Sequence, residues 1–245
     1  MFDLFSDPVK VAQQLEIIRA EFGFATWETL YSLLLEVVFA YVIGLPLGVL
    51  LVTGEKEGIR PLPGWLMKIL NGIINLLRSV PFLILMIIVL PLSKVLVGTK
   101  VGTIATIPPM VIAAFPLVAR MVESSLREVN HGIVEASQSM GASTWQIVTK
   151  VMLPEALPSL ISGGTITVAT ILGYGAMAGV IGGGGLGKMA INYGYYNFKS
   201  IVMWAAVIGL IILVQIFQSA SVKRMLRRVR LGFAEANAAR RKEAI

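Results

Sequence analysis

The sequence contains no cysteine and only one histidine, His131, among its 245 residues. Without cysteine the chain has no disulfide framework, no thiolate metal site and no cysteine nucleophile. A single histidine with no second histidine nearby is typical of a solvated side chain, so we expect neither catalysis nor metal binding there. The residue patterns of hydrolases and redox enzymes are also missing. We therefore predict no catalytic, metal-binding or cofactor-binding residue in this chain.

Charged residues are also scarce, at 14% of the chain, whereas 56% of the residues are hydrophobic and the mean hydropathy is +0.79. This composition is more apolar than that of an ordinary soluble domain and indicates an integral membrane protein. The apolar stretches are continuous rather than alternating, which predicts an all-α fold and excludes a membrane β-barrel. Five windows are long enough to cross the roughly 30 Å bilayer core as helices. They are 31–52, 69–92, 101–119, 157–181 and 201–220.

The positions of lysine and arginine predict the orientation. With a cytoplasmic C-terminus, fourteen of the 21 basic residues fall on the inner side and six on the outer side, while Arg78 lies inside the second window. An excess of basic residues on the cytoplasmic side predicts that the N-terminus is outside and the C-terminus inside. The net charge of +7 then reflects this topology and an attraction to anionic membrane lipid, and we expect no nucleic-acid partner.

The two ends of the chain differ from its middle. Apolar residues recur at spacings of four, three and four from Val11 to Phe22, which indicates an amphipathic helix that lies on the membrane surface or is solvated. We therefore divide the chain into an outer amphipathic segment, a transmembrane domain and a basic cytoplasmic tail. These are residues 1–26, 27–222 and 223–245.

Residues 182–189 read GGGGLGKM and match two phosphate-binding patterns, G-x-x-x-x-G-K and G-x-G-x-x-G. Both patterns require a preceding β-strand, whereas a transmembrane window precedes this one. In addition, Met189 stands where the first pattern needs a magnesium-binding serine or threonine. We predict a glycine-rich hinge or tight loop with positive φ at the outer end of the fourth window. We therefore predict that this chain binds no ATP, so that any ATP and magnesium used with it are bound by another protein.

A polar insert, residues 130–154, lies on the predicted inner side between the third and fourth windows. Asn130 can cap a first helix, and Gly141 can end it in the left-handed conformation. Ser143 and Gln146 form a capping box that opens a second short helix, which we expect Pro154 to end. The pattern predicts a two-helix ledge parallel to the membrane. The simplest alternative is a connector whose apolar stripe packs under its own bundle.

The insert resembles the E-A-A-x-x-x-G and I-x-L-P pattern of permease subunits of bacterial ABC importers, with Ser137 and Val151 as the two departures. The resemblance implies a coupling helix that docks into a cleft of a separate ATPase subunit. The residues assigned to ATPase coupling are Glu135, Ala136, Ser137, Gly141, Ala142, Trp145, Leu153 and Pro154.

Further fragments resemble the five-helix permeases of methionine importers; they are WETL at 27–30, IGLPLGVL at 43–50, RSVPF at 78–82, ARMVE at 119–123, GLG at 185–187 and YGY at 193–195. This resemblance implies a homodimer in the bacterial inner membrane that pairs with two ATPase subunits. It also implies a periplasmic or lipoprotein substrate-binding protein, and alternating-access import of methionine in both D and L forms. One alternative is the same importer class with another small amino acid or osmolyte. An ion-coupled secondary carrier is more remote, because inverted repeats and paired carboxylates are not evident.

Small and polar residues within the windows indicate the pathway. Tyr174 and Met177 share a helical face, and we assign them to the pathway or its gate, with ordinary helix packing as the alternative. Gly175 and Gly179 are assigned to the same region because they allow close helix approach. Arg78 and Pro81 predict a helix kink, with Arg78 either snorkelling to the inner surface or forming an ion pair. Glu36 is expected to snorkel near the outer end of the first window.

Overall fold

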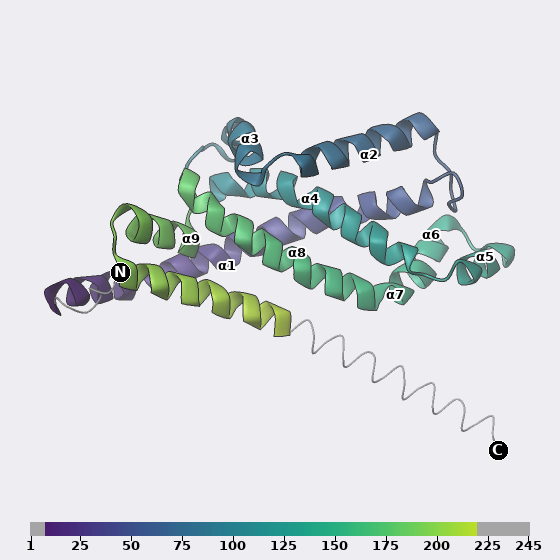
Figure 1. Cartoon of the computed structure of the whole chain (residues 1–245). Coiled ribbons are helices and arrows are strands. Elements are labelled where there is room, and N and C mark those ends of the chain that lie inside the picture. The colour runs from purple at the N-terminus through teal and green to yellow at the C-terminus, as the bar shows by residue number, and fades with distance from the viewer. Residues whose placement is uncertain (1–7, 220–245) are drawn as a thin grey trace, which may run out of the picture.

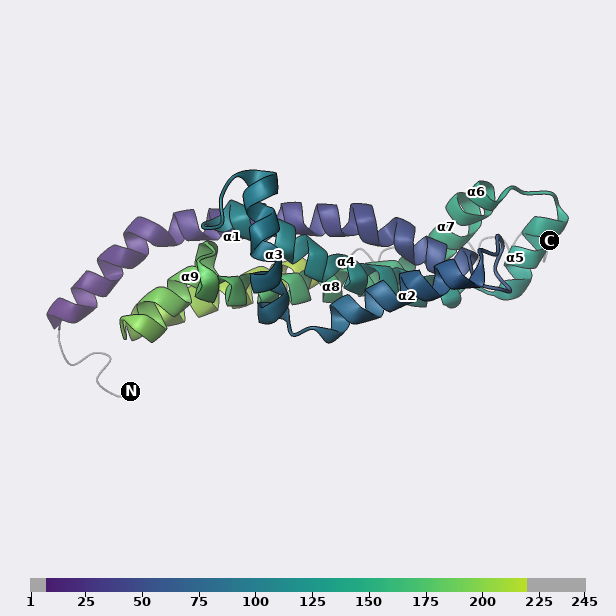
Figure 2. The ribbon, with the colours of Figure 1, turned by 90° about the horizontal axis from the view of Figure 1, so that it is seen from above.

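The computed structural model describes residues 8–219, and all regular elements in this range are helical, as predicted. The longer helices lie side by side along one axis, so the molecule is an elongated bundle (Figures 1 and 2). The basic tail assigned to 223–245 lies outside the described residues.

Helix α1, Pro8–Thr53, is a single helix of 46 residues, about 69 Å long at 1.5 Å per residue. It includes both the amphipathic stretch that begins at Val11 and the whole first window. Residues 8–26 are therefore part of the first long helix, and no helix boundary occurs at residue 26. We call the two ends of the bundle inner and outer according to the orientation that the sequence predicts. Pro46 lies inside α1 without breaking it.

The second window forms two helices, with the break at the kink that Arg78 and Pro81 predict. Helix α2, Gly64–Ser79, and helix α3, Phe82–Val97, meet at an angle of 111°. The break lies at Val80 and Pro81, because proline has no N–H to donate and disfavours the helical conformation of the residue before it. Val80 accordingly adopts φ −79° and ψ 128°, which is extended backbone.

Three further helices are long and apolar: α4, Thr103–Arg127, α8, Leu157–Ala178, which a 3-10 turn extends to Ile181, and the last described helix, Ser200–Ser219. With α1 these make four helices of membrane-spanning length and composition within residues 8–219, or five spans if the bent α2–α3 pair counts as one. The four correspond to the first, third, fourth and fifth predicted windows.

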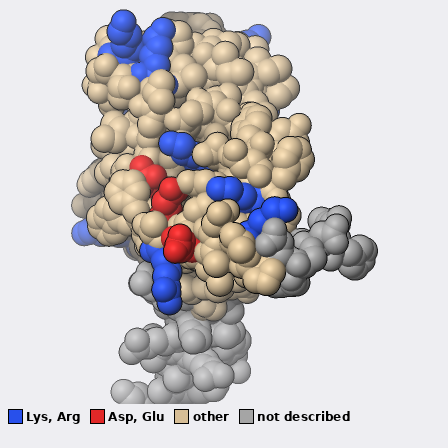
Figure 3. Space-filling model, turned by 90° about the vertical axis from the view of Figure 1, so that its left-hand side faces the viewer, with Lys and Arg blue, Asp and Glu red and all other residues tan. Residues whose placement is uncertain are grey.

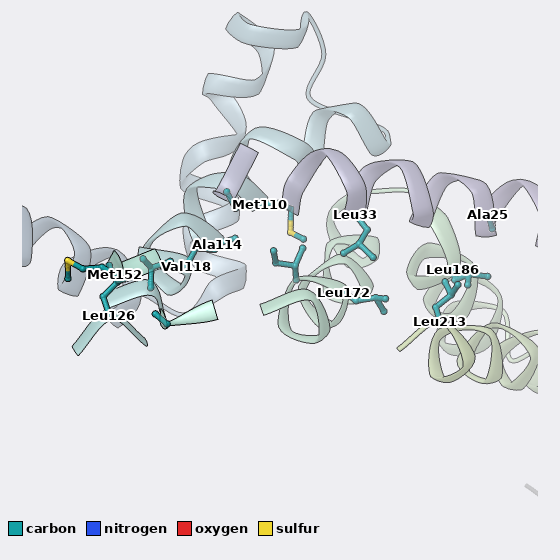
Figure 4. Close-up of a cluster of buried hydrophobic side chains, with 14 of the residues drawn as sticks. Ala25, Leu33, Met110, Ala114, Val118, Leu126, Met152, Leu172, Leu186 and Leu213 are labelled. Carbon is teal, nitrogen blue, oxygen red and sulfur yellow. The ribbon is translucent and has the colours of Figure 1, made fainter. Parts of the chain in front are cut away.

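The core follows α4, which packs between α1 and α8. Glycines bring α1 and α4 close together, since an added Cβ at Gly44 would lie 2.6 Å from Val118 Cβ and one at Gly48 would lie 2.6 Å from the Ala119 carbonyl oxygen. One continuous cluster of buried side chains extends from Met152 at the inner end to Leu186 at the outer end (Figure 4).

The insert contains helix α5, His131–Ser139, helix α6, Thr144–Ile147, a π-helical turn, Val148–Met152, and helix α7, Leu153–Glu155. The expectation that Pro154 ends the second helix is wrong. Pro154 lies in the first turn of α7, where its missing N–H needs no partner, and the helical path continues from there into α8. On the outer side, helix α9, Gly185–Met189, leads into a second π-helical turn, Ala190–Tyr196.

Candidate functional site

The inner insert is shaped by hydrogen bonds between close sequence neighbours. The Asn130 side chain accepts a bond from the Gly132 amide at 2.8 Å and caps α5. Gly141 has φ +79°, the left-handed conformation that favours glycine. The Ser143 hydroxyl accepts from the Gln146 amide at 3.3 Å, while the Gln146 side chain accepts from the Ser143 amide at 2.9 Å. The predicted caps and capping box are thus present.

This insert has one packed face and one open face. Val134, Ile147 and Met152 are buried in the main core, so part of the apolar stripe does pack under the bundle. Met140 and Trp145, in contrast, are 81% and 75% exposed. In Figure 2, α5 and α6 lie together at the end of the molecule opposite α9. The insert therefore offers an apolar surface that residues 8–219 do not cover.

The residues assigned to coupling are distributed over both faces. Ser137 is buried, and its hydroxyl donates to the Ile133 carbonyl at 2.8 Å. Glu135 is exposed, with a carboxylate oxygen 3.2 Å from Nδ1 of the exposed His131. Of the remaining members, Ala136, Gly141, Trp145 and Pro154 are exposed, and Ala142 and Leu153 are half-buried.

A network of charges lies beside the insert, and sequence reasoning missed it. Arg127 of α4 forms a bidentate pair with Glu55, in the loop after α1, and also contacts Glu123 at 2.8 Å. Arg120 bonds to Glu123 at 2.6 Å and to Asn71 of α2 at 2.8 Å. The network thus connects the loop after α1 with α4 and α2. The spacing of Arg120, Glu123 and Arg127 by three and four residues was the available signal.

A cavity of about 460 Å³ separates this network from α5. Its lining includes Glu55 and Arg127 on one side and His131, Glu135 and Gln138 on the other. The insert is therefore only partly packed against the loop after α1.

The glycine-rich stretch forms the second polar site, at the outer end. Glu28 of α1 accepts from the Thr103 hydroxyl at 2.6 Å and from the Gly185 amide at 2.9 Å. Gly182 and Gly185 have φ of +89° and +76°, which confirms the predicted tight loop. A Cβ at Gly184 would overlap Thr103 Oγ1, so this position requires glycine for lack of space. A 3-10 turn after α8, and no strand, precedes the loop.

More contacts hold the outer end against α1. The Tyr193 hydroxyl donates to Glu21 at 2.5 Å, and the Ile201 amide donates to the Gln14 side chain at 3.0 Å. The hydrogen bond to Glu21, followed by partial burial, raises the pKa of Tyr193. Figure 3 shows acidic side chains grouped on this end of an otherwise largely uncharged surface, with basic side chains around them.

The residues assigned to the pathway are only partly brought together. The ring of Tyr174 stacks on Phe82 of α3 with centroids 4.2 Å apart, whereas Met177 is 48% exposed. A Cβ at Gly175 would meet Met110 at an ordinary 3.9 Å, but one at Gly179 would lie only 2.5 Å from the Lys188 amide nitrogen. Gly179 thus allows the close approach of α8 and α9.

Two charged residues of the apolar region differ in environment. Arg78 is exposed, and it lines a cavity of about 210 Å³ together with Tyr174 and Phe82. Glu36 is only 2% exposed, so the expectation that it snorkels is wrong. The reason is its position on the stripe of α1 that also carries Ala40 and Gly44 and is buried in the bundle.

The family described as "Binding-protein-dependent transport system inner membrane component" matches residues 44–227. The chain belongs to this family. The permease is also 49% identical, over 206 residues, to the probable D-methionine transport system permease protein MetI of Vibrio cholerae, covering 84% of this chain and 90% of that protein. It is 46% identical over 153 residues to the D-methionine transport system permease protein MetI of Escherichia coli K12, covering 62% of this chain and 70% of that protein.

Solved structures agree with this assignment. An inward-facing structure of the MetNI methionine ABC transporter matches the permease with a TM-score of 0.83 and 41% identity, over 86% of this chain and 98% of that chain. An amino acid ABC transporter at 15% identity matches with a TM-score of 0.63, over 91% of this chain and 98% of that chain. At this identity it supports the fold alone. The predicted resemblance to ABC importer permeases of the methionine group is confirmed. So are the inner-membrane location and the assignment as a non-catalytic permease subunit.

Proposed function

We propose that this permease imports methionine, in both D and L forms, as the membrane subunit of an ATP-driven transporter. The observation that carries the proposal is the 49% identity to a probable D-methionine transport permease over 90% of that relative's length. The match covers 84% of this chain. A shared substrate is the simplest reason for so extended a similarity.

The proposed assembly is a homodimer of this chain with two ATPase subunits inside and a substrate-binding protein outside. The similarity to a chain of the MetNI transporter supports the ATPase partner. The exposed Met140 and Trp145 supply an apolar surface of the kind that such a partner would cover. Residues 130–154 are then the coupling segment, and 27–222 the transmembrane domain.

In the proposed topology the α2–α3 pair counts as one broken span, giving five spans with the N-terminus outside and the C-terminus inside. The excess of basic residues on the inner side supports this orientation. ATP binding draws the ATPase subunits together, the coupling segments follow them, and the pathway changes from inward to outward access. Tyr174, Met177, Gly175 and Gly179 are proposed to lie along that pathway.

Uptake by proteoliposomes tests the proposal. They would hold this chain, its ATPase and its binding protein, and would be challenged with a panel of labelled amino acids that includes D- and L-methionine. We expect ATP-dependent accumulation of both methionine isomers, with no uptake when ATP is replaced by a non-hydrolysable analogue. Uptake of another amino acid in place of methionine would overturn the substrate and leave the importer class intact. Purification of the complex without an ATPase polypeptide would contradict the class itself.

A further inference from the structure

The cavity beside the α2–α3 break combines apolar walls with two polar groups that lack partners. Its volume is about 210 Å³. Phe82, Leu85 and Leu117 line it as apolar walls. Arg78 and Tyr174 also line it, and within residues 8–219 neither the guanidinium nor the phenol hydroxyl forms a hydrogen bond or ion pair. More of the lining is polar than apolar, which suits a charged solute better than a purely apolar one.

The depth of Arg78 argues against the simple alternative that its side chain snorkels to the inner surface. The cavity joins Arg78 to Tyr174, which lies 17 residues after the start of α8 at Leu157. That separation is about 26 Å along the helix axis, most of the thickness of a bilayer core. At that depth the guanidinium lies beyond reach of the inner surface and near the outer side of the bilayer core, where water or an anion is its partner.

The break in the helix adds a hydrogen-bond acceptor at the same place. Since Pro81 has no N–H, the carbonyl of Leu77 lacks its usual helical donor. Leu77 also lines the cavity. Broken transmembrane helices commonly use such free backbone groups to hold a charged solute.

We infer that this cavity, formed by Arg78, Tyr174 and the α2–α3 break, binds the amino acid in transit. The Arg78 guanidinium takes the α-carboxylate as a bidentate partner, and the ammonium group faces the Leu77 carbonyl and the Tyr174 hydroxyl. The apolar side chain lies against Leu85 and Leu117. The stacked rings of Phe82 and Tyr174 suit a thioether, because sulfur packs favourably against aromatic rings. This inference depends on the proposed function and assigns its substrate site.

The first test uses the reconstituted importer with ATPase and binding protein, and the amino acid that the unmodified importer carries best. We expect Arg78→Gln to lower kcat/KM for uptake roughly 10- to 100-fold, the range that corresponds to one hydrogen bond to a charged group. Lys68→Gln is the matched control, because it removes an exposed charge from the same helix, outside the cavity. Its kcat/KM should not change. Unchanged transport by Arg78→Gln would overturn the inferred site. The proposed import of methionine would stand, because the unmodified importer would still carry it.

The second test detects occupancy without the binding protein, whose own selectivity would otherwise intervene. The natural sequence has no cysteine, so Ala113→Cys places the only thiol of the chain in the cavity lining. Methionine should slow maleimide labelling of that thiol severalfold, whereas methionine amide, which lacks the carboxylate, should not. Protection should disappear when Arg78→Gln is added. Equal labelling with and without methionine, in an importer that transports methionine, would refute the site.

Two milder variants cover the case in which Arg78→Gln fails to assemble. Arg78→Lys keeps the charge but loses the bidentate fork, and Tyr174→Phe keeps the ring stack but loses the hydroxyl. Each should weaken methionine protection at the introduced thiol by severalfold. Full protection in both variants would contradict the assigned contacts.

Discussion

The two polar interruptions of this apolar chain are stabilised in opposite ways. In the inner insert, the capping bonds join residues two and three positions apart, Gly132 to Asn130 and Gln146 to Ser143. In the outer site, the corresponding bonds span 157 residues from Gly185 to Glu28 and 172 residues from Tyr193 to Glu21. The conformation of the inner insert is therefore stabilised mainly by local hydrogen bonds. The conformation of the outer site is stabilised by hydrogen bonds to α1.

This difference suits two mechanical roles. A segment whose shape depends on local bonds keeps that shape when it moves. The inner insert also leaves Met140 and Trp145 exposed for a partner, although its other face packs in the core. The outer loop is fastened to a long helix at several points, so it moves only with that helix. Substitutions should therefore lower global stability at the outer site and affect coupling at the inner site.

The largest effect is expected at Gly179, where α8 and α9 meet. A Cβ there would lie 2.5 Å from the Lys188 backbone nitrogen, so Gly179→Ala should destabilise the protein by about 1–3 kcal/mol. Gly173→Ala is the control, because nothing lies within 4 Å of its added Cβ and alanine favours the helix. Thermal unfolding in detergent should show a lower midpoint for Gly179→Ala alone. Equal midpoints would mean that the two helices can separate at little cost.

Glu28 should give the next largest effect. Glu28→Gln removes the charge from bonds to the Thr103 hydroxyl and the Gly185 amide, and we expect a loss of about 1–2 kcal/mol. Glu16→Gln is a suitable control, since Glu16 is an exposed carboxylate on the same helix. The same unfolding measurement compares the two variants. A stable Glu28→Gln protein would show that the long-range bonds do not fasten the loop.

Gly141 tests the inner side of the comparison. Its φ of +79° disfavours β-branched residues, so Gly141→Val should cost about 1–2 kcal/mol locally, although an added Cβ meets no atom within 4 Å. We expect ATP-driven uptake to fall severalfold, whereas the strain alone should lower the unfolding midpoint by only a few degrees. Gly141→Asn should keep most of the uptake, because asparagine tolerates the left-handed conformation. Full uptake by membrane-inserted Gly141→Val would rule out this turn as a coupling element.

The smallest expected effect is the pH dependence at Tyr193. Its pKa is raised by the hydrogen bond to Glu21, so the neutral phenol is favoured in the folded state. The resulting stabilisation is fully present below the unfolded pKa near 10 and is lost as the pH rises through the higher folded value. The difference in unfolding midpoint between the natural protein and Tyr193→Phe should therefore shrink in alkaline buffer. A difference that stayed constant up to high pH would exclude this bond as its source.

The inner insert could be predicted from the sequence because its signals are local. The positions of Asn130, Gly141 and Ser143 each specify a backbone conformation or a bond to a near neighbour. Pro154 was misjudged for a related reason. A proline ends a helix only if a helical donor is required at its position, and the first turn of α7 requires none.

The outer site and the charge network required the fold. Nothing near Glu28 in the sequence indicates that it meets Gly185, and the partnership of Arg127 with Glu55 depends on where the loop after α1 lies. Pro81 predicted an interruption of the helix in the second window. The size of the bend between α2 and α3, 111°, depends on the helices that pack around the break. Glu36 shares its helical stripe with Ala40 and Gly44, a pattern that could have revealed its burial.

The unbroken length of α1 has a thermodynamic consequence. This one helix holds the outer loop through Glu28 and ends at Thr53, two residues before the partner of Arg127 in the inner network. A helix that contacts both ends of the bundle can carry a displacement from one end to the other. In the proposed importer we therefore expect nucleotide bound inside to alter how tightly the outer protein is held. By reciprocity of equilibria, the outer protein must change the affinity for nucleotide by the same factor.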